Sequence, residues 1–140
     1  VQQLMEKASN RAQDRGQIRT VLGRLCRFHL WEPNHFRMHK HMTQEEALRE
    51  HGPGIKRAYT YKALNKLIQG SAADMTKKSM LELYKEGIIP HIQIHDELDL
   101  SIESDEQAKK IIEIMENAVT LEVPNKVDYE SGKNWGSIND

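Results

Sequence analysis

The sequence predicts an α+β fold, in which helices pack on a small antiparallel sheet. Residues 92–102 alternate apolar and polar side chains on both sides of a polar triplet, which is typical of two half-buried strands joined by a tight turn. Three other stretches, residues 1–15, 56–86 and 104–118, repeat apolar side chains every three to four positions, which indicates helices.

The N-terminal part of the chain is predicted to hold a helix, a hairpin and a connecting loop. These elements cover residues 1–15, 18–22 with 26–30, and 32–54, respectively. Gly16 should end the helix, because glycine often closes a helix in the left-handed conformation. Gly23 and Arg24 lie between the two strands of the hairpin. In the loop, Thr43–Glu46 is a capping box that would start a short helix ending near Gly52.

The C-terminal part is predicted to hold a long helix, a β-hairpin, a second helix and a last strand. These elements cover residues 56–86, 92–102, 104–118 and 126–129. Gly87 should end the long helix, and Ser104–Gln107 is a capping box for the next one. The small residues Gly70–Ala73 would let another backbone approach the long helix closely. We therefore expect a boundary between residues 1–55 and residues 56–140.

Composition and charge narrow the possible functions. With 140 residues, the chain can form one domain with a core, and no apolar run approaches the ~18 residues of a membrane span. Residues 1–66 carry 13 Lys and Arg against 6 Asp and Glu, whereas residues 67–140 carry 7 against 15. A basic first half suits a polyanion, and an acidic second half would repel it unless cations intervene. The alternative explanation of this charge imbalance is that the charged residues simply lie on solvated faces.

The single Cys26 excludes an internal disulfide and is interpreted as a small buried apolar residue.

The triplet His95-Asp96-Glu97 is the strongest local signal in the chain. Two adjacent carboxylates at a hairpin apex repel each other, which is tolerated where water, a cation or a basic partner is close. Carboxylate oxygens are ligands for Mg²⁺, and in two-metal phosphoryl transfer a shared aspartate can hold both ions. From the triplet alone, an acidic turn without a function remains the alternative.

Two further groups of side chains invite a functional interpretation. Lys62, Asn65 and Gln69 fall on one side of the long helix, where the amides could probe base edges in the minor groove. A solvated polar stripe is the alternative. The set His35, His39 and His41 suggests zinc, but no cysteine pair or second histidine cluster completes a tetrahedral site. We therefore do not predict a metal there.

Taken together, four segments in order resemble family A DNA polymerases, the class of bacterial polymerase I and of the polymerases of short-tailed phages. The similar segments are Ala12–Arg24, which ends in a Thr-Val-Leu-Gly-Arg run, Ala63–Asp74, Ile94–Leu98 and Val127–Trp135. The resemblance covers nearly the whole chain. It implies that residues 1–55 hold the helix leaving the fingers, a basic hairpin and a connecting loop. Residues 56–140 would then be a palm segment with a DNA-contacting helix, the catalytic hairpin, a helix and a C-terminal strand.

The resemblance also implies roles for the catalytic hairpin. Asp96 would coordinate the catalytic Mg²⁺ ions, and Glu97 would lie beside them as a supporting metal ligand. His95 would contact the primer end. These three residues are the catalytic set that we expect.

The expected DNA contacts lie outside that hairpin. Asn65 and Gln69 would read the minor groove near the primer terminus, and Arg24 would hold the DNA backbone, with Arg27 from the same basic hairpin beside it. Lys62 stands where the family often has arginine, so any bidentate contact would be lost there.

Two parts of the family pattern are not in this sequence. These are the first catalytic motif, which supplies the other metal-binding aspartate, and the fingers helix that grips the nucleotide. We therefore expect a C-terminal fragment or the small subunit of a split DNA-directed DNA polymerase, inactive alone. Its partners would be primer–template DNA, a deoxynucleoside triphosphate (dNTP) and the remaining polymerase portion, as a separate chain or covalently joined.

Other interpretations stay open at this stage. A non-catalytic nucleic-acid-binding or assembly module could retain the palm fold. A metal-dependent nuclease is a weaker alternative, with Asp99 or Glu103 as its second carboxylate. We expect no membrane association, and a location in the cytoplasm of a bacterial or phage-infected cell, or in an organelle. A phage origin is suggested by the similarity of residues 57–67 to phage-type enzymes.

Overall fold

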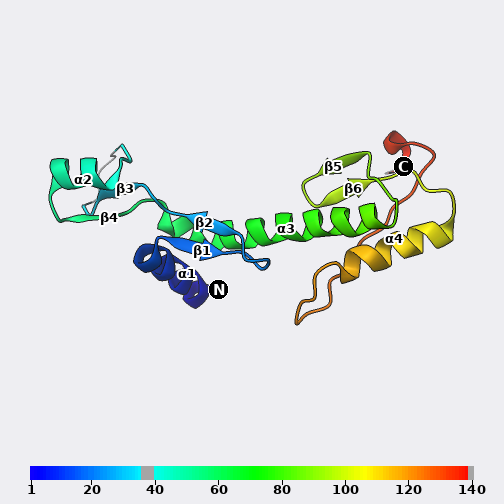
Figure 1. Ribbon diagram of the computed structural model, residues 1–140, viewed down its shortest axis with the longest axis horizontal. Coiled ribbons are helices and arrows are strands. Elements are labelled where there is room, and N and C mark those ends of the chain that lie inside the picture. The colour runs from blue at the N-terminus through cyan, green and yellow to red at the C-terminus, as the bar shows by residue number, and fades with distance from the viewer. Residues whose placement is uncertain (36–39, 139–140) are drawn as a thin grey trace. The chain divides into compact units, whose positions relative to one another are not determined.

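The computed structural model describes residues 1–35 and 40–138, and the chain divides into two compact units, Val1–Asp74 and Met75–Asp140 (Figure 1). The first unit contains α1 (Gln2–Arg15), β1 (Gln17–Arg19), β2 (Leu25–Arg27), β3 (Trp31–Pro33), α2 (Gln44–His51), β4 (Ile55–Arg57), the 3₁₀ turn η1 (Thr60–Lys62) and the start of α3 (Ala63–Lys85). The second contains the rest of α3, β5 (Ile92–Ile94), β6 (Glu97–Asp99), α4 (Asp105–Asn117) and the 3₁₀ turn η2 (Trp135–Ser137). This mixture confirms the α+β class. In the described residues, however, the strands form three separate two-stranded antiparallel ribbons instead of one sheet.

Helix α1 ends where the sequence predicts, at Gly16. Gly16 has φ 65°, and its N–H donates to the carbonyl of Ala12 at 3.0 Å. A Cβ at this position would lie 2.7 Å from Cζ of Arg57, so a larger residue would displace the guanidinium in addition to straining the backbone. The Arg57 guanidinium donates to the carbonyls of Gln13 and Phe28, both at 3.0 Å. Arg57 therefore joins the end of α1 to the end of β2.

The ribbon of β1 and β2 confirms the predicted basic hairpin, with shorter strands than expected. Ile18 pairs with Cys26, and Arg19 pairs with Leu25. The turn takes up residues 20–24, because the Thr20 N–H donates to the Arg24 carbonyl at 3.0 Å and Gly23 has φ 85°. The alternation along β1 buries Ile18 and exposes Arg19.

The prediction of a helix from residue 56 is wrong for its first seven residues. Strand β4 pairs with β3 in the register Trp31–Arg57 and Pro33–Ile55. Tyr59 then takes a left-handed conformation with φ 62°, so a helix can start only after it. The backbone groups at residues 57 and 58 bond to Gln13 and Leu30, far away in sequence, and not within a helix. Long-range pairing has here overridden the local pattern.

The core of the first unit is small and consists mainly of alanine with a few larger side chains. Its buried members are Ala8, Ala12, Ile18, Phe28 and Ala63, with Cys26, Tyr59, Leu64 and Leu67 packed against them. The interpretation of Cys26 as a packed apolar residue is consistent with this environment, in which it is partly buried. Alanines on α1 allow close packing against the ribbon.

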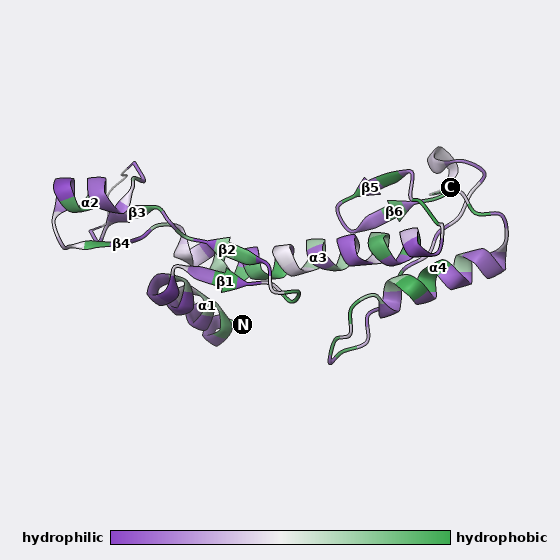
Figure 2. Ribbon diagram, in the orientation of Figure 1, coloured by the Kyte–Doolittle hydropathy of each residue, from purple (hydrophilic) through white to green (hydrophobic). Residues whose placement is uncertain are grey.

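The second unit begins with the C-terminal half of α3, which Gly87 terminates as predicted. The N–H of Gly87 donates to Tyr84 at 3.0 Å and that of Ile88 donates to Leu83 at 2.9 Å, which is the Schellman pattern. Ser104 caps α4, because its hydroxyl accepts from the N–H of Gln107 at 3.2 Å. Along α4, apolar and polar residues follow each other in the pattern of an amphipathic helix (Figure 2).

The predicted strand over residues 126–129 is not formed. This segment has no regular structure, and its Val127 N–H donates to the Glu116 carboxylate at 3.1 Å, not to another strand. A strand needs an edge with which to pair, and no strand of the described residues takes this segment as a neighbour. Within residues 1–35 and 40–138, no helix has the length and apolar character that crossing a membrane requires.

Candidate functional site

The polar triplet lies at the apex of the β5–β6 hairpin. Ile94 pairs with Glu97, so the turn consists only of His95 and Asp96. His95 has φ 51°, a left-handed conformation that costs a residue other than glycine about 1–2 kcal/mol. The side chains of His95, Asp96 and Glu97 are all exposed. The hairpin therefore presents the triplet to the surroundings on a short, fixed turn.

Carboxylates gather around Glu97. Because Glu97 and Asp99 are two residues apart on β6, they lie on the same side of the ribbon. Repulsion from Asp99 is the largest cause that raises the pKa of Glu97, followed by burial and a hydrogen bond with Asp99 and by the charges of Glu130 and Asp96. In the described residues, the buried Oδ2 atom of Asp99 has no hydrogen-bond partner. The hairpin carries an excess of negative charge that a cation would relieve.

The described residues do not form a complete metal site. No three His, Cys, Asp or Glu side chains among them come together in an arrangement that could hold an ion. Asp96 and Glu97 are oxygen donors of the kind Mg²⁺ prefers, and Mg²⁺ is commonly bound by one or two carboxylates together with water and phosphate oxygens. The donors present therefore fit part of a magnesium site.

The predicted DNA-reading face lies on η1 and α3 in the first unit. Lys62, Asn65 and Gln69 are exposed. The ammonium of Lys62 lies 5.1 Å from the ring centroid of Tyr59 and 5.6 Å from that of Tyr61, in cation–π contact with both. The structure thus leaves both amides and the ammonium on the surface of one helical segment.

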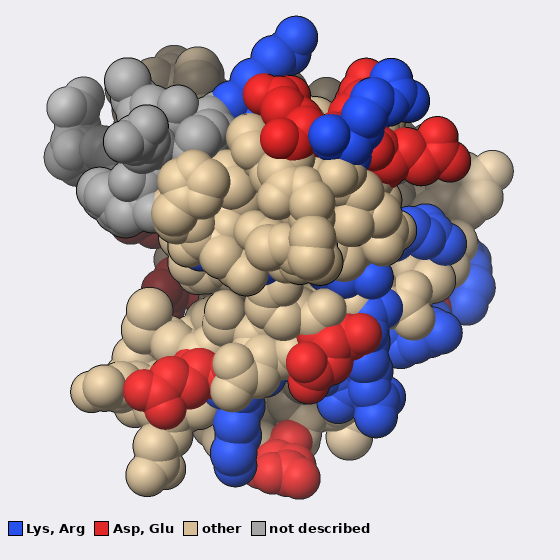
Figure 3. Space-filling view, turned by 90° about the vertical axis from the view of Figure 1, so that its left-hand side faces the viewer, with Lys and Arg blue, Asp and Glu red and all other residues tan. Residues whose placement is uncertain are grey.

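Charged side chains are not spread evenly over the first unit. Arg27 lies on the exposed side of the β1–β2 ribbon opposite Gln17, and Arg19 shares that side. Helix α2 instead has acidic residues in its first turn and basic residues in its last turn. Figure 3 looks onto the end of the unit that carries α2 and shows residues of both signs next to each other. The ribbon and α3 are therefore better suited to a polyanion than α2 is.

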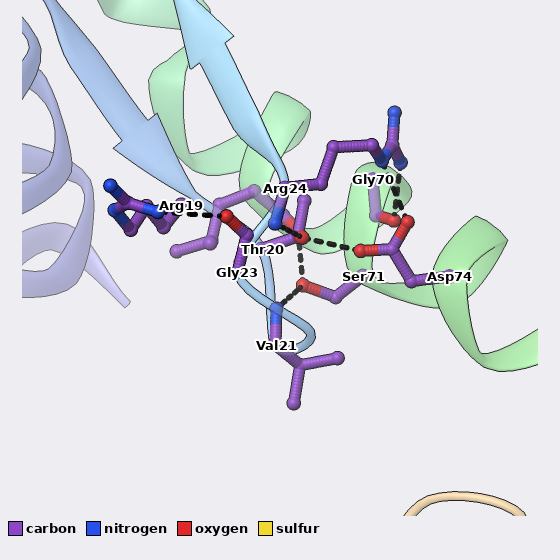
Figure 4. A network of polar contacts seen from close by, with 9 residues as sticks. Arg19, Thr20, Val21, Gly23, Arg24, Gly70, Ser71 and Asp74 are labelled. Atoms are coloured by element: carbon purple, nitrogen blue, oxygen red, sulfur yellow. Dashed lines mark hydrogen bonds and ion pairs between the residues drawn. The ribbon is translucent and has the colours of Figure 1, made fainter. Parts of the chain in front are cut away.

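Arg24 is held by α3 and does not extend freely into solvent (Figure 4). Its Nε atom donates to the Asp74 carboxylate at 2.7 Å, and Nη2 donates to the carbonyl of Gly70 at 2.8 Å. The Arg24 side chain is still 51% exposed, whereas that of Asp74 is only 7% exposed. The Thr20 hydroxyl donates to the second oxygen of the same carboxylate. The sequence did not indicate this network, because Asp74 lies 50 positions from Arg24.

The two described histidines of the set, His35 and His41, have different contacts. His41 contacts Glu32 through Nε2 at 3.1 Å and the Tyr59 hydroxyl through Nδ1 at 2.8 Å. The ring of His35 lies 6.1 Å from that of His51. His39 lies outside the described residues. Contacts with Glu32 and Tyr59 explain the position of His41 without a metal.

Comparisons with known proteins agree with one another. Residues 1–137 match the family model described as DNA polymerase family A. A DNA-directed DNA polymerase of Pseudomonas phage M6 is 33% identical over 136 residues, which are 97% of this chain and 17% of that protein. DNA polymerase I of Borreliella burgdorferi is 40% identical over 85 residues, which are 54% of this chain and 9% of that one.

A solved structure is similar in fold over almost the whole chain. It is the POL domain of Pol1 from M. smegmatis in complex with DNA primer–template and dNTP. The match has a TM-score of 0.69 and 27% identity, and it covers 99% of this chain and 23% of that one. The chain thus spans less than a quarter of the length of these relatives.

Proposed function

Because this chain belongs to DNA polymerase family A, we propose that residues 94–98 supply the third catalytic motif of a DNA-directed DNA polymerase. The observation that carries the proposal is the acidic β5–β6 hairpin, within a chain of which residues 1–137 match the family. Binding alone would not require two carboxylates at a strained apex. In this proposal the reaction is nucleotidyl transfer from a dNTP to a primer 3′-hydroxyl.

Asp96 and Glu97 would hold Mg²⁺ at the apex of the hairpin, Asp96 as the principal ligand and Glu97 in support. Bound there, Mg²⁺ would favour loss of the proton from the primer hydroxyl and neutralise the departing pyrophosphate. Repulsion from Asp99 raises the pKa of Glu97, and a bound cation would relieve that repulsion. His95 occupies the fixed apex and would contact the primer end.

Asn65 and Gln69 would read the minor groove of the primer–template duplex. Amide side chains can donate to the acceptors that every base pair presents there, so they test the shape of a pair more than its sequence. Lys62 would add a phosphate contact, as would Arg24 and Arg27. Support for this role comes from the exposure of these side chains and from the primer–template DNA named with the M. smegmatis relative.

The chain would act together with a polymerase portion that carries the other catalytic aspartate and the nucleotide-binding helix. That portion is either a separate chain or covalently joined. In this proposal, residues 1–55 would form the segment that connects the fingers subdomain of the polymerase to the palm. Residues 56–140 would form part of the palm subdomain. We place this activity in the cytoplasm of a bacterial or phage-infected cell, because the relatives are phage and bacterial polymerases.

The proposal is tested by primer extension with the chain assembled with that portion. Asp96→Ala should abolish Mg²⁺-dependent extension and leave duplex binding nearly unchanged, because Asp96 is assigned to the metals and not to DNA. Asp128→Ala is the matched control, since Asp128 is also exposed in the second unit but lies in the irregular segment after α4. Near-normal extension by the Asp96 variant would contradict the proposal. Duplex binding without any extension by the wild type would favour a non-catalytic binding module.

A further inference from the structure

Asp74 is a buried carboxylate on α3 that the proposed chemistry does not use. Its side chain is 7% exposed, and its two oxygens accept from different residues of the β1–β2 turn, Thr20 and Arg24. The Thr20 hydroxyl also accepts from the backbone N–H of Arg24 at 3.0 Å. Burying a carboxylate is costly unless it is paired and hydrogen-bonded, and here both conditions are met. Figure 4 shows the carboxylate facing the turn.

The turn is fastened to α3 at a second point. The N–H of Val21 donates to the Ser71 hydroxyl at 3.0 Å, and that hydroxyl donates to the carbonyl of Leu67 at 2.7 Å. A Cβ on Gly70 would lie 2.8 Å from Cγ2 of Thr20, so the turn packs directly on the glycine. This confirms the close approach that the small residues at 70–73 predict. The contact begins one residue after Gln69.

The same contacts fix the guanidinium of Arg24. Nε and Nη2 are bonded to Asp74 and Gly70, so the planar group has one orientation. These two bonds lie on the side of the group that faces α3, and one nitrogen of the group points away from α3 in Figure 4. A guanidinium offers five donors, so the outward edge keeps donors for an anion. A held arginine also loses less conformational entropy when it binds.

We propose that Asp74 is a positioning residue for DNA binding: it holds Arg24 so that the outward edge of the guanidinium meets a phosphate of the primer–template duplex. This inference rests on the proposed function, because it assumes that α3 and the ribbon face DNA. The same carboxylate holds the turn against α3 next to Gln69. The proposed phosphate contact of Arg24 and the proposed minor-groove contact of Gln69 therefore keep a fixed position relative to each other. Asp74 itself stays buried and does not contact the duplex.

A purely electrostatic role for Asp74 predicts the opposite result. If the carboxylate only neutralised Arg24, its removal would free a positive charge and tighten binding to DNA. If it positions Arg24, its removal weakens binding although the net charge of the chain rises. The sign of the change therefore separates the two roles.

The test uses the chain assembled with the remaining polymerase portion and a fluorescently labelled primer–template duplex, with affinity measured by anisotropy over a range of salt concentrations. Asp74→Asn should weaken binding about five- to ten-fold, as expected for loss of a charge-assisted contact. It should also lower the slope of log K against log salt by ~0.9, the value for one phosphate contact. Asp14→Asn is the matched control, because Asp14 is exposed on α1 of the same unit, and it should bind as tightly as wild type or tighter.

A double variant and a conservative variant keep the proposal testable even if Asp74→Asn misfolds. Arg24→Ala should weaken binding about as much as Asp74→Asn, and adding Asp74→Asn to it should weaken binding little further, because the two residues act as one unit. Arg24→Lys keeps the charge but not the planar group, so positioning predicts weak binding, whereas charge alone predicts wild-type affinity. The Lys variant decides the question if Asp74→Asn does not fold.

Three outcomes distinguish the inference from the proposed function. Unchanged or tighter binding by Asp74→Asn, with Gln69→Ala weakened, would overturn the inference and leave the function standing. Wild-type binding by Arg24→Lys would overturn it in the same way. A wild-type assembly that does not bind the duplex would overturn both.

Discussion

Gly16→Ala should destabilise the first unit by more than the usual cost of placing alanine in a left-handed conformation. That conformational cost is about 1–2 kcal/mol. The added methyl group would also lie 2.7 to 3.0 Å from three atoms of the Arg57 guanidinium, which must then move. The hydrogen bonds of the Arg57 guanidinium to the carbonyls of Gln13 and Phe28 would weaken, and each bond contributes about 0.5–1.5 kcal/mol. The sum is a loss of about 2–4 kcal/mol in the free energy of unfolding.

Urea unfolding followed by far-UV circular dichroism measures this loss. Gly23→Ala is the matched control, because Gly23 belongs to the same unit and has φ 85°, with nothing within 4 Å of an added Cβ. It should show the conformational cost alone. If Gly16→Ala loses no more stability than Gly23→Ala, the Arg57 contact does not hold the end of α1 in place.

Three further substitutions test the hairpin, the α2 cap and the DNA-reading face. Glu97→Gln should raise the melting temperature at pH 7, because the pKa of Glu97 is raised in the folded chain and its contribution to stability is therefore lost as pH rises. The gain over wild type should vanish at acid pH. Thr43→Ala should cost ~1 kcal/mol of unfolding free energy, since the Thr43 hydroxyl accepts from the N–H of Glu46 and the Glu46 carboxylate accepts from the N–H of Thr43. Thr120→Ala, in the exposed segment after α4, should cost almost nothing in the same urea titration. Gln69→Ala should weaken duplex binding about ten-fold with an unchanged salt slope, whereas Gln3→Ala on α1 should bind like wild type; equal affinities would remove Gln69 from the interface.

Local signals predicted the ends of the helices well. Gly16 and Gly87 end α1 and α3, and Thr43 and Ser104 begin α2 and α4, because each cap depends on backbone groups within a few residues. In the second cap, the Gln107 side chain accepts from the N–H of Glu103 instead of that of Ser104, a detail that the capping pattern did not predict.

The predictions from sequence are wrong where a residue bonds with a partner that is distant in the sequence. Residues 56–62 have a helical pattern, but the backbone of Lys56 and Arg57 bonds with β3 and Gln13, which lie more than 20 positions away. The position of Asp74 in the helical pattern did not indicate that it would be buried against Thr20. Ile68 is an apolar residue within the helical pattern of residues 56–86 but is 55% exposed, because the turn packs on Gly70 and Asp74 instead.

The candidate site was predictable only where its residues are close together in sequence. The hairpin follows from alternation in residues 92–102, and its two-residue turn places His95 and Asp96 at the apex. Its strands are shorter than that alternation predicts, and β5 is exposed along its length instead of half-buried. The repulsion between Glu97 and Asp99 follows from their spacing on one strand. The ligands that would complete a metal site do not follow from this sequence.

The most direct test of the central claim is the single-turnover rate of one-nucleotide extension by the complete polymerase, measured against Mg²⁺ concentration. We expect Asp96→Asn to lower the rate by a factor of at least ~10³, equivalent to ~4 kcal/mol of transition-state stabilisation, at every Mg²⁺ concentration and with unchanged duplex affinity. Asp128→Asn should match wild type. A rate within a few-fold of wild type for the Asp96 variant would contradict the claim that this hairpin carries the catalytic metals.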